Sequence, residues 1–320
     1  MKVHPRVSVV MPAYNVGAFV GEAVRSVLEQ NWPEVELLVM DDGSTDDTAA
    51  ALERAAAEWR REGRSLVLAS QPNRGAPAAI NALIERASGD VLCFCDADDA
   101  MEPDLLSALV PLLGGDPSLD LAFPGYVYVD EAGEFFGVVS AAPRPRYDAE
   151  TFFVENPIEC STGACLPMDA VRRAGPFDET LEGCTHLDFF LRVVADRPGN
   201  AAGVDRRLVR YRRRRGQITS DWRRMRAAWI KVTAARVAGN DAFGPDALRR
   251  ARARQSIFWS AIAYQQGDYA ASRGLVADAW RSSVAETMRD PQAWVRSAAG
   301  LASLLPPPIH RALARGFGRR

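Results

Sequence analysis

The stretch Asp90-Val91-Leu92-Cys93-Phe94-Cys95-Asp96-Ala97-Asp98-Asp99 decides the fold of this chain. Its five apolar residues, Val91–Cys95, are followed by a cluster of acids, which is typical of a short strand buried on both faces. Side chains alternate along an extended chain, so Asp96 and Asp98 point the same way and can share one cation or one polyol. A second interpretation stays open, because Asp98 and Asp99 could cap a helix that begins near Met101–Pro103.

Strands and helices alternate along the chain before this stretch. Further strands are expected at Val7–Met11, Glu36–Met40 and Ser65–Ala69, and helices at Ala18–Gln30, Ala49–Arg61 and Ala78–Ala87. This alternation predicts a Rossmann-like α/β fold with a doubly wound, mostly parallel sheet and right-handed crossovers. Ligands bind such sheets beyond the carboxyl ends of the strands. The loops that carry Tyr14, Asp42 and the Asp96/Asp98 pair should therefore converge at one edge.

The loops also exclude two common classes of site. The first strand is not followed by Gly-x-Gly-x-x-Gly, and the chain has no Walker-type loop. A standard dinucleotide site or P-loop is therefore not expected. The polar segment Asp41–Thr48 fits a binding loop, but Asp, Gly, Ser and Thr are also the residues that turns and helix starts use.

Four segments in order carry a resemblance to a known family. They are Val7–Asn15, Asp41–Asp46, Asn73–Gly75 and Asp96–Asp99. Together they resemble the successive motifs of family 2 glycosyltransferases of the GT-A fold, over about residues 5–220. The resemblance implies an inverting glycosyltransferase that moves a sugar from a nucleotide-diphosphate sugar, with a UDP-sugar as first candidate, to a hydroxyl acceptor. On this resemblance we expect donor binding at Pro12, Ala13, Tyr14, Asp42, Asn73, Gly75, Asp96 and Ala97, and Arg214 joins this set on the charge argument given below.

The resemblance also implies that Asp98 holds Mg²⁺ or Mn²⁺ against the diphosphate of the donor. A nucleoside diphosphate is a poor leaving group until its charge is neutralised. A hard divalent cation on carboxylate oxygen neutralises that charge as a Lewis acid, without needing a proton. We therefore expect Asp98 to matter for the chemical step.

The segment Glu182–Arg192 is where the family places its catalytic base, and this chain departs from the family there. Relatives commonly have Glu-Asp-x-Asp at Thr185–Asp188, so alignment on Asp188 puts His186 where the base aspartate would lie. A histidine with an ordinary pKa of about 6.5 suits proton acceptance at neutral pH. His186 and Asp188 are both candidate bases, and a structural role for either stays equally open.

Two further departures concern the diphosphate. Ile80 stands where relatives often have an arginine, and Arg214 replaces a histidine in Tyr211–Thr219, the segment that resembles the one closing the family's site. Arginine binds phosphate bidentately and cannot ligate a metal as imidazole can. The resulting hypothesis is that Arg214 binds the diphosphate while the affinity for metal falls.

Aromatic residues mark a hairpin expected over Gly125–Val139, with its turn near Glu131–Gly133. These residues are Tyr126, Tyr128, Phe135 and Phe136. They could line a pocket for an acceptor sugar. Cross-strand packing explains each of them at least as well.

Charge is distributed unevenly along the 320 residues. Residues 1–205 carry 15 Lys+Arg and 34 Asp+Glu, whereas residues 206–320 carry 24 and 7. We expect a catalytic domain at 1–220 and a basic α-helical C-terminal region at 221–320. Its helices are expected at Trp222–Val237, Pro245–Gln266, Tyr269–Met288 and Trp294–Leu305, followed by an apolar, arginine-rich tail.

Partners and location follow from charge and hydropathy. The basic region could face an anionic membrane, although an arginine-rich helical face is more often simply solvated. A nucleic-acid partner is not expected, because the run Arg212–Arg215 lies in an otherwise acidic domain with a recognisable site. No apolar run reaches the roughly 18 residues of a membrane span. We expect a cytoplasmic protein, with peripheral contact at the inner face of the membrane as an option that would suit a lipid-linked acceptor.

The five cysteines are scattered and fit no zinc spacing, so buried free thiols are expected.

The acceptor would be a cell-surface polysaccharide, a glycolipid or a similar hydroxyl compound. The alternative function is a catalytically weak or inactive GT-A domain that binds nucleotide or sugar, motivated by Ile80, His186 and Arg214.

Overall fold

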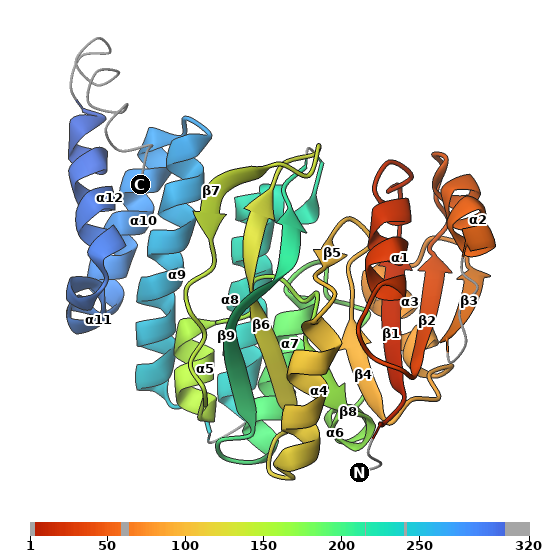
Figure 1. The fold of residues 1–320 in the computed structure, drawn as a ribbon. Helices are drawn as coiled ribbons and strands as arrows, with labels where there is room; N and C mark the ends of the chain where they lie inside the picture. The colour runs from red at the N-terminus through yellow and green to blue at the C-terminus, as the bar shows by residue number, and fades with distance from the viewer. Residues whose placement is uncertain (1–3, 59–63, 215, 240–241, 305–320) are drawn as a thin grey trace. The chain divides into compact units, whose positions relative to one another are not determined.

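The structure, a computed structural model, describes residues 4–58, 64–214, 216–239 and 242–304 (Figure 1). The chain divides into two compact units. Met1–Ala149 and Pro157–Gln217 form the first unit, and Glu150–Asn156 with Ile218–Arg320 form the second. Each unit is described by itself.

The first unit is built on one sheet with the strand order β3-β2-β1-β4-β8-β6-β9-β5, and β7 pairs with β6 (Figure 1). The strands are β1 (Val7–Ala13), β2 (Val35–Asp41), β3 (Arg64–Ser70), β4 (Val91–Phe94), β5 (Ala100–Met101), β6 (Leu121–Val129), β7 (Phe135–Val139), β8 (Cys165–Pro167) and β9 (Ala201–Arg212). Strands β1 to β4 are parallel, β6 is parallel to β9, and β5, β7 and β8 run antiparallel to their neighbours. The expected Rossmann-like α/β fold is confirmed.

The strand order places a topological switch point between β1 and β4. From β1 the chain moves outward through β2 and β3, and then returns to the other side of β1 as β4. Ligands bind sheets of this kind beyond the carboxyl ends of the strands at such a point. The Asp-x-Asp segment follows β4 and so lies at the switch point.

Helices cover the sheet of the first unit. They are α1 (Val20–Leu28), α2 (Thr48–Glu58), α3 (Ala76–Ile84), α4 (Leu105–Gly115), α6 (Met168–Ala174) and α7 (Thr185–Asp196). Helix α1 shows why these segments fold as they do, because it buries Val20, Val24 and Val27 on one stripe at helical spacing. The expected hairpin is also present, since β6 and β7 pair antiparallel across a turn in which the Gly133 N–H donates to the Asp130 carbonyl at 3.0 Å.

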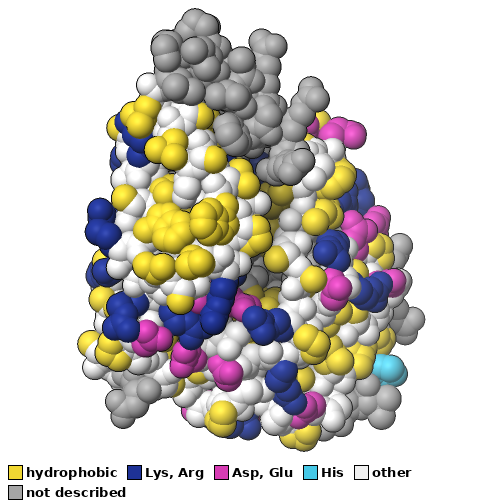
Figure 2. Space-filling model, turned by 90° about the vertical axis from the view of Figure 1, so that its left-hand side faces the viewer, with side chains coloured by type: hydrophobic (Ala, Val, Ile, Leu, Met, Phe, Trp, Pro, Cys, Tyr) yellow, Lys and Arg dark blue, Asp and Glu magenta, His cyan; other side chains and the backbone are white. Residues whose placement is uncertain are grey.

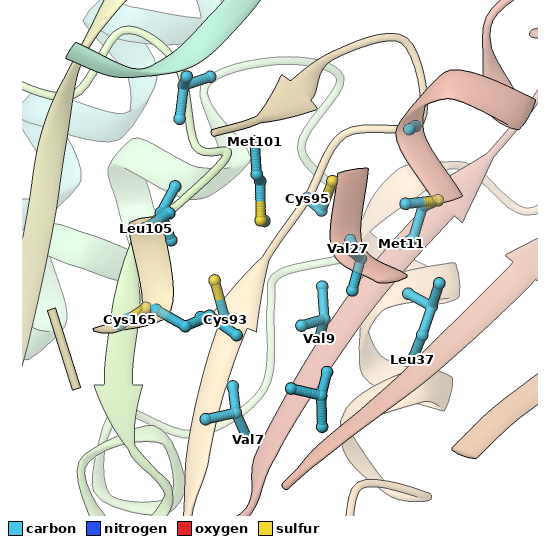
Figure 3. Packing of buried hydrophobic residues seen from close by; sticks show 14 of the residues in the cluster. Val7, Val9, Met11, Val27, Leu37, Cys93, Cys95, Met101, Leu105 and Cys165 are labelled. Carbon is cyan, nitrogen blue, oxygen red and sulfur yellow. The ribbon is translucent and has the colours of Figure 1, made fainter. Parts of the chain in front are cut away.

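The core beneath the switch point is aliphatic and carries the expected free thiols (Figure 3). Cys93, Cys95 and Cys165 lie among side chains such as Val9 and Met101. All five cysteines of the chain are free, and four of them are buried. Burial raises the pKa of the Cys93 and Cys95 thiols well above the usual range, which keeps them uncharged.

The second unit is helical. Its elements are α5 (Ala149–Glu155), a 3-10 turn at Ile218–Ser220, α8 (Trp222–Gly239), α9 (Pro245–Gln265), α10 (Tyr269–Ser282), α11 (Val284–Arg289) and α12 (Pro291–Ala302). Rings join these helices, because Trp229 meets Trp259 at 5.4 Å between centroids and Phe153 stacks on Phe243 at 4.9 Å. No helix in the described ranges is long and apolar enough to cross a membrane.

The single helix expected at Tyr269–Met288 is wrong. Ser283 has extended backbone angles and ends α10, and its hydroxyl accepts the Glu286 N–H at 3.3 Å to begin α11. A serine that caps a new helix competes with continuation of the old one. The expected tail after Pro306 lies outside the described residues.

Candidate functional site

The donor-binding residues predicted from the sequence gather at the carboxyl edge of β1, β2 and β4. Pro12 and Ala13 end β1, and the Tyr14 ring that follows is exposed. Ala97 is buried between Asp96 and Asp98 in the loop after β4. The convergence expected from the alternation of strands and helices is therefore present.

Asp42 is buried and organises the loop after β3. Its Oδ1 accepts the side-chain amide of Gln71 at 2.7 Å and the Arg74 N–H at 3.0 Å, and its Oδ2 accepts the Gly75 N–H at 2.8 Å. Gly75 has φ of 90° and precedes α3, a conformation that favours glycine. The structure thus brings Asp42 together with the Asn73–Gly75 loop, and the Asp42 carboxylate sets the shape of that loop.

Asp96 is held by a segment more than sixty residues further along the chain. The Ser161 hydroxyl donates to Asp96 Oδ2 at 2.9 Å, and the Asp96 N–H donates to Thr162 Oγ1 at 2.9 Å. Burial, together with the charge of Asp98, raises the pKa of Asp96 to about 6. Gly163 has φ of 86°, and a Cβ there would come within 2.8 Å of Leu105, so this segment requires glycine.

Asp99 is a buried structural acid and does not cap a helix. It accepts the Thr162 hydroxyl at 2.7 Å, the Cys160 thiol at 3.2 Å and the Arg212 N–H at 2.9 Å. Burial, followed by the charges of the neighbouring aspartates, raises its pKa well above the usual range. Helix α4 begins at Leu105 after Asp104, so the expectation that Asp98 and Asp99 cap a helix is wrong.

Arg212 ties two loops and helix α1 together from a position that is only 1% exposed. Its Nε donates to the Asp98 carbonyl at 2.9 Å, one terminal nitrogen donates to the Asp130 and Glu131 carbonyls at 3.0 and 3.1 Å, and the other pairs with Glu22 at 2.5 Å. The backbone of the Asp-x-Asp loop is therefore fixed by an arginine at the end of β9.

Arg214 pairs directly with Asp98. Its Nε lies 2.6 Å from Asp98 Oδ2, and its guanidinium carbon lies 5.9 Å from the centroid of the Phe19 ring. Among the described residues, no group of three or more His, Cys, Asp or Glu side chains could hold a metal ion. A hard cation at Asp98 therefore fits this site only if ligand oxygens from outside the chain complete its coordination and Arg214 gives up part of its contact.

The two candidate bases lie in the first turn of α7, next to β4. The His186 ring packs against Phe94, Phe177 and Phe190 at 5.1, 5.3 and 6.0 Å between centroids. Within the part of the chain that the structure covers, its buried Nε2 has no hydrogen-bond partner. Burial lowers the pKa of His186 to about 4, so the imidazole is neutral at pH 7.

Asp188 has a charged partner. It is buried and accepts the Arg192 Nε at 3.2 Å, and Arg192 also donates to the Pro176 carbonyl at 2.8 Å. This arrangement joins α7 to the segment after α6. The contact gives Asp188 a structural role in addition to any chemical one.

The aromatic residues of the hairpin divide into packed and exposed sets. The Tyr126 and Tyr128 rings meet at 5.3 Å, and both hydroxyls donate to Glu159 Oε2, at 3.0 and 2.9 Å. Both rings also meet Tyr211 of the neighbouring strand β9, at 5.6 and 5.3 Å between centroids, so cross-strand packing accounts for both tyrosines. Phe135 and Phe136 on β7 are exposed.

Sequence reasoning missed three residues that build the site: Ser161, Thr162 and Arg212. The turn signal at Gly163 was visible in the sequence, but nothing local pairs Thr162 with Asp99 across 63 positions. Arg212 and Arg214 also differ from the solvated patch expected of a nucleic-acid binder, because Arg212 is buried and Arg214 is paired with Asp98.

Comparisons with known proteins agree with this geometry. The sequence model of the family described as Glycosyl transferase family 2 matches residues 8–173. The chain is 27% identical over 228 residues to the putative teichuronic acid biosynthesis glycosyltransferase TuaG of Bacillus subtilis, covering 71% of this chain and 86% of TuaG. It is 26% identical over 189 residues to the chondroitin synthase of Escherichia coli, covering 59% of this chain and 26% of that protein.

A solved structure shares the fold. S. aureus TarS 1–349 in complex with UDP-GlcNAc has a TM-score of 0.63 at 16% identity, covering 97% of this chain and 92% of that chain. At this identity the likeness bears on the fold alone. It confirms the expected GT-A architecture with C-terminal helices.

Proposed function

Because the chain belongs to glycosyl transferase family 2, we propose that it transfers a sugar from a nucleotide-diphosphate sugar, with a UDP-sugar as first candidate, to a hydroxyl group of an acceptor. The observation that carries the proposal is the Asp-x-Asp loop at the switch point between β1 and β4. The complex of TarS 1–349 with UDP-GlcNAc supports the choice of donor.

In this proposal, the base of the nucleotide binds beside Pro12, Ala13, Tyr14 and Asp42. Asp42 acts mainly by holding the Asn73–Gly75 loop in place, because its oxygens already accept three hydrogen bonds. Asp96 faces the ribose, with Ala97 as a small residue beside it. A carboxyl whose pKa is about 6 can exchange hydrogen bonds with ribose hydroxyls in either protonation state.

Asp98 is the proposed ligand of Mg²⁺ or Mn²⁺. When bound, such a cation would neutralise the charge that develops on the diphosphate leaving group. Arg214 is the second positive group at the site, and its planar guanidinium suits a diphosphate better than a single carboxylate oxygen. We propose that Arg214 leaves Asp98 for the diphosphate when the donor binds.

His186 is the first candidate for the base that removes the acceptor proton, and Asp188 is the second. A pKa of about 4 makes His186 as weak a base as an ordinary aspartate, the residue that relatives have at this position. Its neutral form is then ready to accept a proton at any pH above about 5. One base and one displacement would give transfer with inversion.

The acceptor is proposed to be a hydroxyl of a cell-surface polysaccharide or a glycolipid, which could be lipid-linked. The similarity to a putative teichuronic acid biosynthesis glycosyltransferase supports this class. A lipid-linked acceptor would agree with peripheral membrane contact through the basic second unit.

One observation favours the alternative of a nucleotide- or sugar-binding domain with weak or no activity. The Arg214 guanidinium already neutralises Asp98, so the site holds a positive charge before any metal arrives. If Arg214 kept this position in the donor complex, Asp98 would not be free for a cation. Turnover of a nucleotide-diphosphate sugar distinguishes the two functions, because only a transferase cleaves the donor.

The test is thermal stabilisation by a panel of nucleotide-diphosphate sugars, with and without Mn²⁺ or Mg²⁺, followed by donor hydrolysis. A donor at about 100 times its dissociation constant should stabilise the fold by about 2.7 kcal/mol. Asp98→Ala should lose metal-dependent stabilisation and hydrolysis, whereas Asp205→Ala, an exposed acid on β9, should keep both. Stabilisation without hydrolysis would favour the binding domain, and no response to any donor would overturn the proposal.

A further inference from the structure

The solvent-facing side of α11 and α12 is apolar, although such a side normally carries polar residues. Val284 and Met288, one turn apart on α11, are each 56% exposed. Trp294 and Leu301, two turns apart on α12, are 53% and 69% exposed. We call these four residues, with the exposed Leu304, the α11–α12 face.

The residues of this face form one surface. The Trp294 Nε1 donates to the Met288 carbonyl at 3.2 Å, which joins the two helices, and the Trp294 ring meets Trp280 at 5.5 Å between centroids. Figure 2, which views the side on which α11 and α12 lie in Figure 1, shows hydrophobic side chains gathered in a patch, with Lys/Arg and Asp/Glu side chains mixed along one border. An exposed patch of this kind marks a surface that meets another molecule.

The C-terminal region that contains the face is basic in sequence. Residues 221–320 carry 17 Lys+Arg and 7 Asp+Glu. Acids near the face already have partners. Glu286 is buried and pairs with Arg250 and Arg254 at 3.2 and 3.0 Å. Asp290 caps α12, and its side chain accepts the Gln292 N–H at 2.8 Å. Arg289, next to Met288, is exposed.

We propose that the α11–α12 face is the surface on which this protein lies on a bilayer that contains anionic lipid. The tryptophan and the aliphatic side chains enter the boundary between headgroups and acyl chains, and the surrounding arginines bind the lipid phosphates. The α11–α12 face would be the surface that makes the membrane contact put forward above. It rests on the proposed function only for the use of that contact, which is access to a lipid-linked acceptor.

A second copy of the chain fits this face less well than a membrane does. A stable interface between proteins buries about 800 Å² on each partner and takes about 20–30 residues from each side. The face has five apolar side chains. A two-fold interface would also bring the positive charges of both copies to the same interface, which is unfavourable for self-association, whereas anionic lipid attracts them.

The experiment measures binding of the full chain to vesicles of phosphatidylcholine alone and of phosphatidylcholine with phosphatidylglycerol. The wild type should co-sediment with the anionic vesicles, and less so as salt is raised. Leu301→Ser and Trp294→Ser should each weaken that binding about tenfold. Leu112→Ser, which removes an exposed leucine of α4 in the first unit, should leave it unchanged.

Thermal melts and donor stabilisation of each variant show that it is folded, so weaker vesicle binding is not caused by a loss of folding. Failure of the wild type to bind anionic vesicles would overturn the proposal, and so would equal binding by Leu301→Ser. A dimer in sedimentation velocity that Leu301→Ser dissociates, without vesicle binding, would assign the face to a second copy instead. A lack of response to any donor would count against the proposed function and leave the vesicle result standing.

Discussion

The Arg214 Nε lies 2.6 Å from Asp98 Oδ2, so the acid that the sequence assigns to a metal already carries a positive partner. The side chains of both residues are mostly buried. Arg214 and a divalent cation therefore compete for one carboxylate oxygen.

The first prediction concerns this competition. Arg214→Ala should bind Mn²⁺ in the absence of nucleotide about tenfold more tightly than the wild type, because a charge-assisted contact worth roughly 1.5–3 kcal/mol no longer opposes the cation. In the wild type, Mn²⁺ and UDP should strengthen each other's binding, because UDP draws Arg214 away. Calorimetric titrations with Mn²⁺, with UDP and with both measure these affinities.

The matched control is Arg213→Ala. Arg213 lies over the Tyr128 ring, with its guanidinium carbon 5.7 Å from the centroid. This variant should bind Mn²⁺ as the wild type does. Equal Mn²⁺ affinity in all three proteins would show that Arg214 does not shield Asp98.

The second prediction concerns Arg212. Arg212→Met should lower the free energy of unfolding by about 3 kcal/mol, because it leaves the carbonyls of Asp98, Asp130 and Glu131 without their buried donor. Urea denaturation measures the change. Arg213→Met, at the half-buried neighbouring position, should cost less than 1 kcal/mol, and equal losses in the two variants would refute a special role for Arg212.

The first four strands could be predicted from the sequence because each is a short, mostly apolar run bounded by turn residues, and all but the partly exposed β3 are buried. Strand β9 could not be predicted in this way. It contains the charged run Asp205–Arg207 and ends in arginines, so its hydrophobic pattern is broken. Its last residue, Arg212, is buried, although arginine is among the residues least often buried.

The site was predicted only as far as its local motifs reach. Asp96 and Asp98 could be placed because the switch-point rule fixes where the loop after β4 lies. The extended segment expected there is wrong, since the loop is a turn in which the Asp99 N–H donates to the Asp96 carbonyl at 3.1 Å. Their partners Thr162 and Arg214 come from segments 66 and 116 positions away, and no local pattern specifies such pairs. The break at Ser283 was missed because helical periodicity continues through it and only the cap ends the helix.

The third prediction concerns His186 and pH. The pKa of His186 is lowered to about 4 in the folded state, so the unfolded chain binds a proton between about pH 6.5 and 4 and the folded protein does not. The contribution of His186 to stability should therefore fall as the pH is lowered from 7 to 5, by about 1–2 kcal/mol. Urea denaturation of the wild type and His186→Gln at both pH values measures the difference.

NMR gives a direct check of the same pKa. The ring signal of His186, assigned by its absence from His186→Gln, should not shift between pH 8 and 5.5. A midpoint near pH 6.5 for His186 would contradict its burial among the phenylalanines.

The last prediction concerns Thr162, which accepts the Asp96 N–H and donates to Asp99 Oδ2 at 2.7 Å. Thr162→Val keeps the shape of the side chain but leaves a buried N–H and a buried carboxyl each short of a partner, which should cost about 2–3 kcal/mol of stability. The Asp96–Asp98 loop should also lose its fixed position, so affinity for UDP should fall about tenfold. Thr180→Val, which removes an exposed hydroxyl bonded to Asp178 at 2.7 Å, should change neither quantity. Denaturation measures the stability of both variants, and calorimetric titration measures their affinity for UDP. Unchanged UDP affinity in a folded Thr162→Val would show that Asp96 does not need this anchor to bind a nucleotide.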